Sequence, residues 1–320
     1  MPDFSSSIES LQVQRGVGTS TNGSGAFGAS INILTDIVSD QPYAELSSSF
    51  GSYNTLKNTI KFSTGKINDY FELSGRLSKI DSDGYVDRAY SDLKSYFIQG
   101  AYTNGSTLIK AISFGGHEKT YQAWDGLSMD QVLENRRQNP LTYENEIDNY
   151  KQDHFQLHWN EKINNYWSFN LGLNYTDGRG YFEQYKEDDD INTYGGIVKS
   201  DIDSNGNETG TTDLIRRRWL DNDFYVLNSS INYIKDKIVL TLSSSYSSYV
   251  GDHYGEVIWA RSLSNTGEIR DRYYEGLGEK KDLSFFAKLL YSINKKTELY
   301  TDIQLRGVKY NTSGITSDLI

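Results

Sequence analysis

The chain has 320 residues, a formal net charge of −11 and no cysteine. An acidic chain does not suit a nucleic-acid partner, because binding to a phosphate backbone depends on clustered basic residues. The lack of cysteine excludes disulfides and thiolate metal sites. With 28 Gly and 25 Tyr against only 3 Pro, the composition favours an extended all-β architecture.

Two short strands around a glycine-rich turn are the first predicted elements. Residues 8–15 and 29–33 both alternate apolar with polar side chains. Glycines recur between these strands, as expected where a backbone must adopt positive φ. Taken alone, the pattern also fits an ordinary soluble hairpin with a flexible turn.

Alternating strands follow from Tyr43 onward, about eleven in number. In the clearest of them, 167–175, every second residue is apolar and the residues between are small or polar; 225–233 and 283–291 repeat the pattern. A soluble β-sandwich could bury such faces. Aromatic residues at both ends, such as Trp167 with Tyr175, instead favour strands that cross a membrane between two interfacial girdles.

The lengths of the connections give a second argument. Predicted turns at 66–69, 104–106, 161–165, 235–237 and 294–297 alternate with long links at 81–93, 121–152, 178–222 and 251–281. Short turns at one end and long loops at the other are typical of outer-membrane barrels. No stretch approaches the roughly 18 apolar residues of a spanning helix. The sequence therefore predicts an all-β fold, a transmembrane antiparallel β-barrel.

The N-terminal hairpin resembles the closing segment of the plug domain in TonB-dependent outer-membrane receptors. In that family an Ile-Glu-x-(Ile/Leu)-x-Val-x-Arg-Gly strand leads through a glycine-rich turn to Gly-Gly-x-Ile-Asn-Ile, and this chain follows the pattern at 8–16 and 25–33. It departs at Val17, where proline is usual, and at Asn22, where tyrosine is usual. The residues that carry the match are Arg15, Gly16, Gly23, Gly25, Gly28 and Asn32.

The resemblance implies two domains, the end of a plug at 1–40 and the N-terminal half of a barrel at 41–320. Plugged transporters close with about 22 strands, and an open half-barrel leaves unpaired edges, so a longer parent protein is expected. In the family, TonB with ExbB and ExbD acts on a plug segment that would lie outside this chain. Arg15 occupies the place of a plug arginine that pairs with barrel glutamates, and Glu72 is one expected partner.

Candidate ligand-binding residues lie in the two longest predicted loops or at their edges. Aromatic and arginine side chains dominate binding hot spots, and arginine suits anionic chelates. An equal alternative is that the tyrosines form an outer girdle while the arginines balance acidic loops. The candidates are Tyr181, Tyr185, Arg216, Arg217, Arg218, Trp219, Trp259, Arg270, Arg272 and Tyr273.

Catalytic and metal-binding patterns are not found. His154 and His158 would share one strand face about 13 Å apart, too far for one metal ion. Asp201 and Asp203 open like a calcium loop, but Thr212 stands where the closing glutamate belongs, so a hairpin tip is favoured over weakly bound Ca²⁺. The chain is therefore expected to be no enzyme and to hold no cofactor.

The expected function is energised import across the outer membrane of a Gram-negative bacterium, in contact with outer-membrane lipid. The resemblance implies a small, scarce chelate as cargo, most often a ferric siderophore and otherwise haem or cobalamin. A SusC-like importer of glycans or peptides would use the same fold with a lipoprotein lid. A passive porin would need no plug, and an adhesin or soluble sandwich would partition into buffer without detergent.

Overall fold

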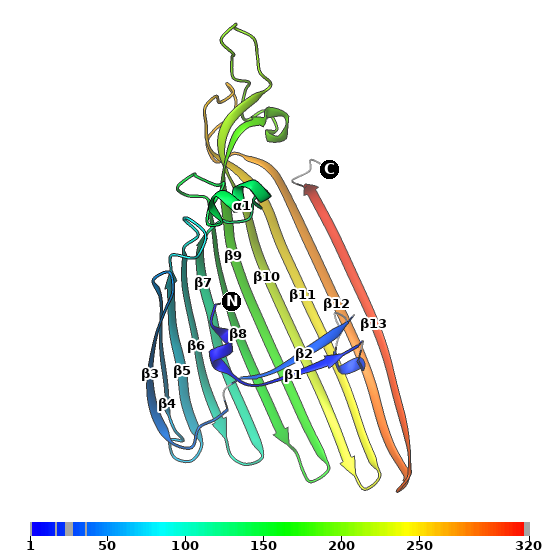
Figure 1. Cartoon of the computed structure of the whole chain (residues 1–320). Helices are drawn as coiled ribbons and strands as arrows, with labels where there is room; N and C mark the ends of the chain where they lie inside the picture. Colours follow the sequence, from blue (N-terminus) through cyan, green and yellow to red (C-terminus); the bar gives the residue numbers. More distant parts are fainter. Residues whose placement is uncertain (1, 17, 23–27, 36, 317–320) are drawn as a thin grey trace.

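Two antiparallel sheets make up the chain. The computed structural model describes every residue except 1, 17, 23–27, 36 and 317–320. A two-stranded sheet of β1 (Ile8–Arg15) and β2 (Ala29–Thr35) lies beside an 11-stranded sheet, in which each strand from β3 to β13 pairs with its sequence neighbours (Figure 1). This arrangement confirms the predicted all-β fold and the number of barrel strands.

The strands of the large sheet lengthen along the chain, from 10 residues in β3 to 25 in β10. Among the described residues, β3 and β13 each have a partner strand on one side only, so the sheet is not closed. No helix in the described part of the chain is long and apolar enough to cross a membrane. The strands are β3 (Pro42–Gly51), β4 (Thr55–Thr64), β5 (Phe71–Ser82), β6 (Ser91–Thr103), β7 (Thr107–Tyr121), β8 (Ile147–Lys162), β9 (Trp167–Asp190), β10 (Thr211–Lys235), β11 (Ile238–Ala260), β12 (Arg272–Asn294) and β13 (Thr297–Ile315), and the helical segments are η1 (Phe4–Ser7), η2 (Ser20–Asn22), α1 (Met129–Asn135) and η3 (Ile191–Tyr194).

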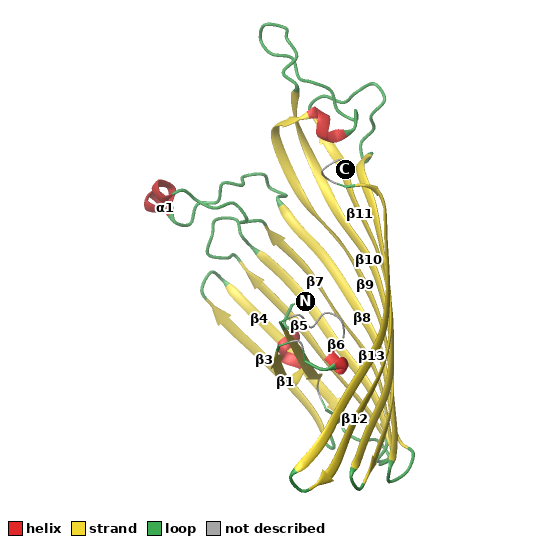
Figure 2. Ribbon diagram, turned by 90° about the vertical axis from the view of Figure 1, so that its right-hand side faces the viewer, coloured by secondary structure: helices red, strands yellow, loops and turns green. Residues whose placement is uncertain are grey.

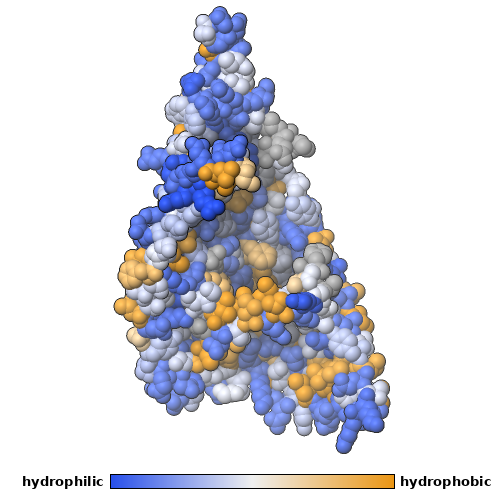
Figure 3. Space-filling model, in the orientation of Figure 1, coloured by the Kyte–Doolittle hydropathy of each residue, from blue (hydrophilic) through white to orange (hydrophobic). Residues whose placement is uncertain are grey.

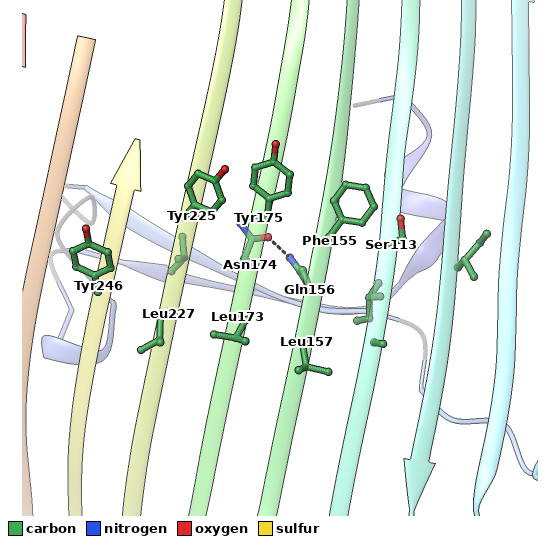
Figure 4. Close-up of a pocket in the computed structure, with 14 residues that line it drawn as sticks. Ser113, Phe155, Gln156, Leu157, Leu173, Asn174, Tyr175, Tyr225, Leu227 and Tyr246 are labelled. Carbon is green, nitrogen blue, oxygen red and sulfur yellow. Dashed lines mark hydrogen bonds between the residues drawn. The ribbon is translucent and has the colours of Figure 1, made fainter. Parts of the chain in front are cut away.

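The convex face of the large sheet carries an apolar band. Directly paired residues share a face, so the side chains that line a groove of about 620 Å³ on this face come from neighbouring strands (Figure 4). They include Phe155, Leu157, Leu173, Tyr175, Tyr225 and Leu227. The alternate positions Gln156 and Asn174 are hydrogen-bonded to each other at 3.1 Å. This is the predicted alternation of an apolar and a polar face.

The concave face is polar and is crossed obliquely by the hairpin of β1 and β2 (Figures 1 and 2). On β5, Glu72 and Arg76 face this side and are buried, whereas Leu73 and Leu77 face the convex side and are exposed. Figure 3 shows hydrophobic side chains gathered across the middle of the concave side, where the hairpin lies. The exposed apolar residues of the hairpin include Leu11, Val13, Ile31 and Ile33.

Short turns lie at one end of the sheet and longer connections at the other, as predicted (Figure 1). The predicted extents of the longest loops are wrong, however. β9 runs to Asp190 and β10 begins at Thr211, so much of the predicted loop at 178–222 is paired strand. β11 likewise reaches Ala260 and β12 begins at Arg272, inside the predicted loop at 251–281. Cross-strand pairs of aromatic and charged side chains stabilise these extensions, which no apolar period reveals.

Candidate functional site

β9 to β12 extend beyond the apolar band, and their side chains divide between the two faces of the sheet. Neighbouring positions of a strand point to opposite sides. The register aligns Arg218 with Phe182 on the concave side, and it aligns Trp219 with Tyr181 on the convex side. Arg217 shares the convex side with Trp219. The predicted ligand-binding residues therefore form two separate groups.

The concave side of these extensions holds a groove of about 580 Å³, here called the upper groove. The guanidinium carbon of Arg218 lies 6.0 Å from the centre of the Phe182 ring and 5.9 Å from that of Tyr274. Gly276 and Gly278 leave room in the lining, because an added Cβ would meet no atom closer than 3.6 Å, and Gly251 and Gly314 line the groove as well. Tyr249, His253 and Tyr310 also line the groove. A guanidinium among aromatic rings suits an anionic ligand with flat or apolar parts.

Arg216 and Tyr273 build the wall beside the upper groove. Arg216 is buried, and its guanidinium donates to Tyr194 Oη at 3.1 Å and to Gln184 Oε1 at 3.1 and 3.3 Å. The Tyr194 hydroxyl donates to Asp189 at 2.5 Å, and burial raises the pKa of Tyr194. Tyr273 is also buried, and its ring packs 4.9 Å from that of Tyr194. These contacts hold Arg216 and Tyr273 in fixed positions.

A stack of aromatic rings and arginines covers the convex side of the same extensions. The rings of Tyr181 and Trp219 lie 4.6 Å apart, and Tyr254 continues the stack 5.9 Å from Trp219. Arg217 lies 4.3 Å over the Tyr181 ring, and Arg272 lies 3.6 Å over the Tyr254 ring. Each such contact contributes about 0.5–1 kcal/mol at an exposed site. The stack stiffens the paired strands from outside.

Glu183 lies beneath this stack and is 3% exposed. Arg217 Nε donates to Glu183 Oε2 at 2.8 Å, and the Tyr143 hydroxyl donates to Glu183 Oε1 at 2.7 Å. Burial, together with the hydrogen bond to the Glu183 carboxylate, raises the pKa of Tyr143 to about 12. Glu183 thereby ties the loop between β7 and β8 to the extension of β10.

The remaining predicted residues lie at the top of the convex side. The Tyr185 hydroxyl donates to Asp213 at 2.8 Å, and this hydrogen bond raises the pKa of Tyr185 to about 12. Trp259 is 44% exposed. Arg270 is mostly exposed and lies 3.7 Å from the carboxylate of Glu256. A role of these residues in binding cargo stays a prediction.

The predicted plug-motif residues that the structure describes close the hairpin. Gly16 has a φ of +87°, and its N–H donates to the carbonyl of Gly28 at 2.8 Å. A left-handed backbone of this kind favours glycine. Arg15 ends β1, and Asn32 lies in the middle of β2. Gly23 and Gly25 lie outside the described residues.

The expected ion pair between Arg15 and Glu72 is not formed. Glu72 accepts from the Ser39 N–H at 3.1 Å and from the Ser63 hydroxyl at 2.7 Å. β1 runs away from β5 across the concave face, so Arg15 lies towards β12 and β13 (Figure 1). Among the described residues, Arg15 is exposed and makes no ion pair.

A buried ion pair holds the start of the hairpin, and in it the sheet supplies the arginine and the N-terminal segment supplies the carboxylate. Arg76 of β5 is 1% exposed; its Nη1 lies 3.0 Å from Asp3 Oδ2, and its Nε donates to Ser7 Oγ at 2.8 Å. Lys57 Nζ and Ser78 Oγ reach the same carboxylate, each at 2.5 Å. Sequence reasoning missed this site, although an arginine between two serines on the polar face of β5 was a signal for it.

The turn of the hairpin is held at the other edge of the sheet. The Ser20 N–H donates to Asp302 Oδ2 of β13 at 3.0 Å, and the Ser20 hydroxyl donates to Asp302 Oδ1 at 2.5 Å. The hairpin therefore bridges the concave face from β5 to β13.

Other groups of the protein already bond the carboxylates of the loop that resembles a calcium site. Asp201 accepts from the hydroxyls of Thr212 and Ser262, at 2.9 and 2.6 Å, and Asp203 accepts from the N–H groups of Asn205 and Asn207. Over the described residues, no group of three or more His, Asp or Glu side chains is arranged to hold a metal ion.

His154 and His158 both lie on the concave face of β8, as their spacing predicts. A ring nitrogen of His154 is hydrogen-bonded to Thr176 Oγ1 at 2.8 Å, and a ring nitrogen of His158 to Gln156 Oε1 at 3.1 Å. His154 also stacks on Phe114, with the ring centres 4.5 Å apart. Each imidazole is thus engaged separately within the sheet.

No family model and no curated protein matches the sequence. Solved structures do. The open form of the ferric-catecholate import receptor Fiu from E. coli superposes with a TM-score of 0.73 at 13% identity, over 97% of this chain and 51% of that receptor. This chain has the fold of an outer-membrane receptor.

Two further receptors of this fold show the same partial coverage. The ferripyoverdine receptor of the outer membrane of Pseudomonas aeruginosa, bound to ferripyoverdine, matches with a TM-score of 0.68 at 10% identity, over 97% of this chain and 42% of that one. The unliganded ferric citrate transporter FecA matches with a TM-score of 0.66 at 12% identity, over 96% and 44%. The chain spans about half the length of these receptors.

Proposed function

We propose that the chain forms the end of the plug and the first half of the barrel of an energised importer in the outer membrane of a Gram-negative bacterium. Its fold is similar to receptors for ferric catecholates, ferripyoverdine and ferric citrate. The exposed apolar band, with aromatic rings such as Trp167 and Tyr175 at its edges, suits contact with lipid. The hairpin across the concave face suits a plug.

The upper groove is the observation that carries the choice of cargo, a small anionic ferric chelate such as a siderophore. Arg218 lies between the Phe182 and Tyr274 rings, on the same side of the sheet as the hairpin. A guanidinium donates to carboxylate or catecholate oxygens, and aromatic rings cover the organic parts of a chelate. Cargo bound in the groove would rest above the plug.

The attachment of the hairpin supports a need for energy from TonB, with ExbB and ExbD. Displacing the hairpin would separate Asp3 from Arg76 and Lys57 and would break the contact of Ser20 with Asp302. A plug held at both edges of the sheet fits an importer in which it is pulled, whereas a passive porin has no use for such contacts.

The test is uptake by the full parent protein, with and without TonB, using a panel of radiolabelled ferric chelates, haem and cobalamin. We expect one ferric chelate to enter only when TonB is present. Arg218→Ala should lower its binding to the purified protein about tenfold or more, since a charge-assisted contact contributes about 1.5–3 kcal/mol.

The matched control is Arg270→Ala, which removes an arginine from the convex side of the same extensions. It should leave binding unchanged. If no cargo depends on TonB, the importer proposal is wrong. If a cargo depends on TonB but Arg218→Ala binds it normally, the importer stands and the upper groove is not its binding site.

A further inference from the structure

A row of basic side chains crosses four neighbouring strands on the convex face. The register pairs Lys79 of β5 with Lys94 of β6, Lys94 with His117 of β7, and His117 with Lys151 of β8. Directly paired residues share a face, so all four project outward. At a strand spacing of about 4.8 Å, the row is about 14 Å long.

Apolar side chains lie directly below this row. Ile60, Leu77 and Tyr96 are paired in register on β4, β5 and β6, two positions from Asn58, Lys79 and Lys94. Leu46, Ile60 and Leu77 are 73%, 48% and 52% exposed. The basic row and these apolar residues line one hollow of about 570 Å³, here called the lysine groove. Its upper edge is cationic, and its lower edge is apolar.

The lysine groove presents three lysines and His117, and three aspartates, Asp81, Asp92 and Asp153, balance the lysines. Its described lining contains Lys79, Lys94, His117 and Lys151 against Asp153. The lysines also contact aspartates, with Lys151 2.7 Å from Asp153, but these pairs are exposed on the lysine side. Exposed ion pairs contribute about 0–1 kcal/mol, so the lysines can exchange a carboxylate for a phosphate at little cost.

The same level of the sheet is different farther along the chain. The row continues from Lys151 to Arg179 of β9, then to Asp221 of β10 and Asp252 of β11. Arg179 is paired with Asp221 at 3.3 Å. The basic row thus runs from β5 to β9 and is replaced by aspartates on β10 and β11, so it is not a uniform belt of charge.

We propose that the lysine groove binds one phosphorylated lipid of the surrounding membrane. Its acyl chains lie against Leu46, Ile60 and Leu77, and its phosphate contacts Lys94 with Lys79 or Lys151. The arrangement of cationic and apolar edges matches the two ends of such a molecule, with the phosphate at the upper limit of the apolar band. The inference depends on the barrel lying in a membrane and not on the identity of any cargo.

The test measures lipid binding to the full parent protein, purified in detergent, by native mass spectrometry. The probes are phosphatidic acid and diacylglycerol with the same acyl chains, which differ only in the phosphate. We expect a single phosphatidic acid to bind, and diacylglycerol to bind at least tenfold more weakly. Each lysine near an anionic lipid contributes about fivefold, so K79Q/K94Q/K151Q should weaken phosphatidic acid on the order of 100-fold.

The matched control is K237Q/K295Q/K296Q, which removes three lysines from the short turns at the opposite end of the sheet. It changes the net charge equally and should leave binding within about twofold. Lys94→Glu alone tests the site if the triple variant does not fold, and it should lose most of the binding. Equal binding of the two lipids, or full binding by both lysine-groove variants, would overturn the proposal.

Discussion

The two faces of the large sheet reverse the usual distribution of side chains. On β5, Arg76 of the concave face is 1% exposed, whereas Leu77, the next residue, is 52% exposed on the convex face. A soluble protein buries the leucine and exposes the arginine. Here the surroundings of each face determine which side chains are exposed. The hairpin covers the polar face, and the apolar face suits an apolar solvent.

The difference between the faces also separates two kinds of stability. Contacts on the concave face hold the hairpin to the sheet, through Asp3 with Arg76 and through Ser20 with Asp302. The convex side chains instead match the sheet to its surroundings. The same substitution should therefore change the free energy of unfolding by different amounts on the two faces.

The largest effect is expected for Arg76→Ala. The change removes the buried one of the two cations at the Asp3 carboxylate, together with the hydrogen bond to Ser7, and leaves Lys57; it should lower the free energy of unfolding by about 3–5 kcal/mol. Urea unfolding measures it. Lys79→Ala, on the same strand but the convex face, is the control and should leave the free energy of unfolding nearly unchanged. Equal losses in the two variants would contradict the comparison.

A smaller effect is expected when charge is placed in the apolar band. Leu173→Arg puts a guanidinium on the convex face and should cost about 2–4 kcal/mol in a lipid bilayer. Asn174→Arg, one residue later, points to the concave side and should be tolerated better. The measurement is unfolding from lipid vesicles. A larger loss for Asn174→Arg would show that the faces are assigned the wrong way round.

Glu183→Gln should loosen the loop between β7 and β8 by about 1–3 kcal/mol, since Arg217 and Tyr143 both bond its carboxylate. The pKa of Tyr143 should fall from about 12 towards its ordinary value of 10.0. The raised pKa means that this contact stabilises the loop below pH 10 and is lost as pH rises through about 12.

Ultraviolet titration of tyrosinate, with Tyr143→Phe to identify the signal, follows this change. Tyr185 provides the comparison, and Tyr185→Phe identifies its signal. Because the Tyr185 hydroxyl is bonded to Asp213, its pKa should not respond to Glu183→Gln. An unchanged Tyr143 pKa in Glu183→Gln would show that the carboxylate does not set it.

The smallest effect is expected at the turn of the hairpin. Asp302→Ala removes the acceptor for Ser20 at an exposed site and should cost about 1 kcal/mol. Hydrogen exchange of β1 and β2 should become about fivefold faster, while exchange in β8 and β9 stays unchanged. Asp302→Asn keeps one acceptor oxygen, and its exchange rates in β1 and β2 should lie between those of the unchanged protein and those of Asp302→Ala. Uniform exchange in all three proteins would mean that this contact does not hold the turn.

The strands and their faces could be predicted from the sequence because a strand has a period of 2 and the apolar face is nearly continuous. The alternation around Leu173 and Asn174 is an example. Beyond the band this signal ends, since both faces become polar and aromatic. The extension of β9 and β10 was therefore predicted as loop, although its backbone is fully paired over most of its length.

The candidate site was predictable only in part for a related reason. Arg216, Arg217 and Arg218 are adjacent in sequence, and an arginine run gives no indication of which member faces the groove. A register shift between Ile215 and Arg216 adds a further uncertainty that no local pattern resolves. The Asp3–Arg76 pair joins residues 73 positions apart, and only the three-dimensional path of the hairpin brings them together.

The contact between Ser20 and Asp302 joins residues separated by 282 positions of the chain. A ribosome makes Ser20 long before Asp302, so the hairpin cannot complete its docking while β13 is still unformed. Contacts of such high sequence separation form slowly, because a long loop must close before they give any stability. Docking of the hairpin onto the sheet should thus be a late event in the folding of this chain. A docked hairpin would indicate that the strands from β5 to β13 have already formed.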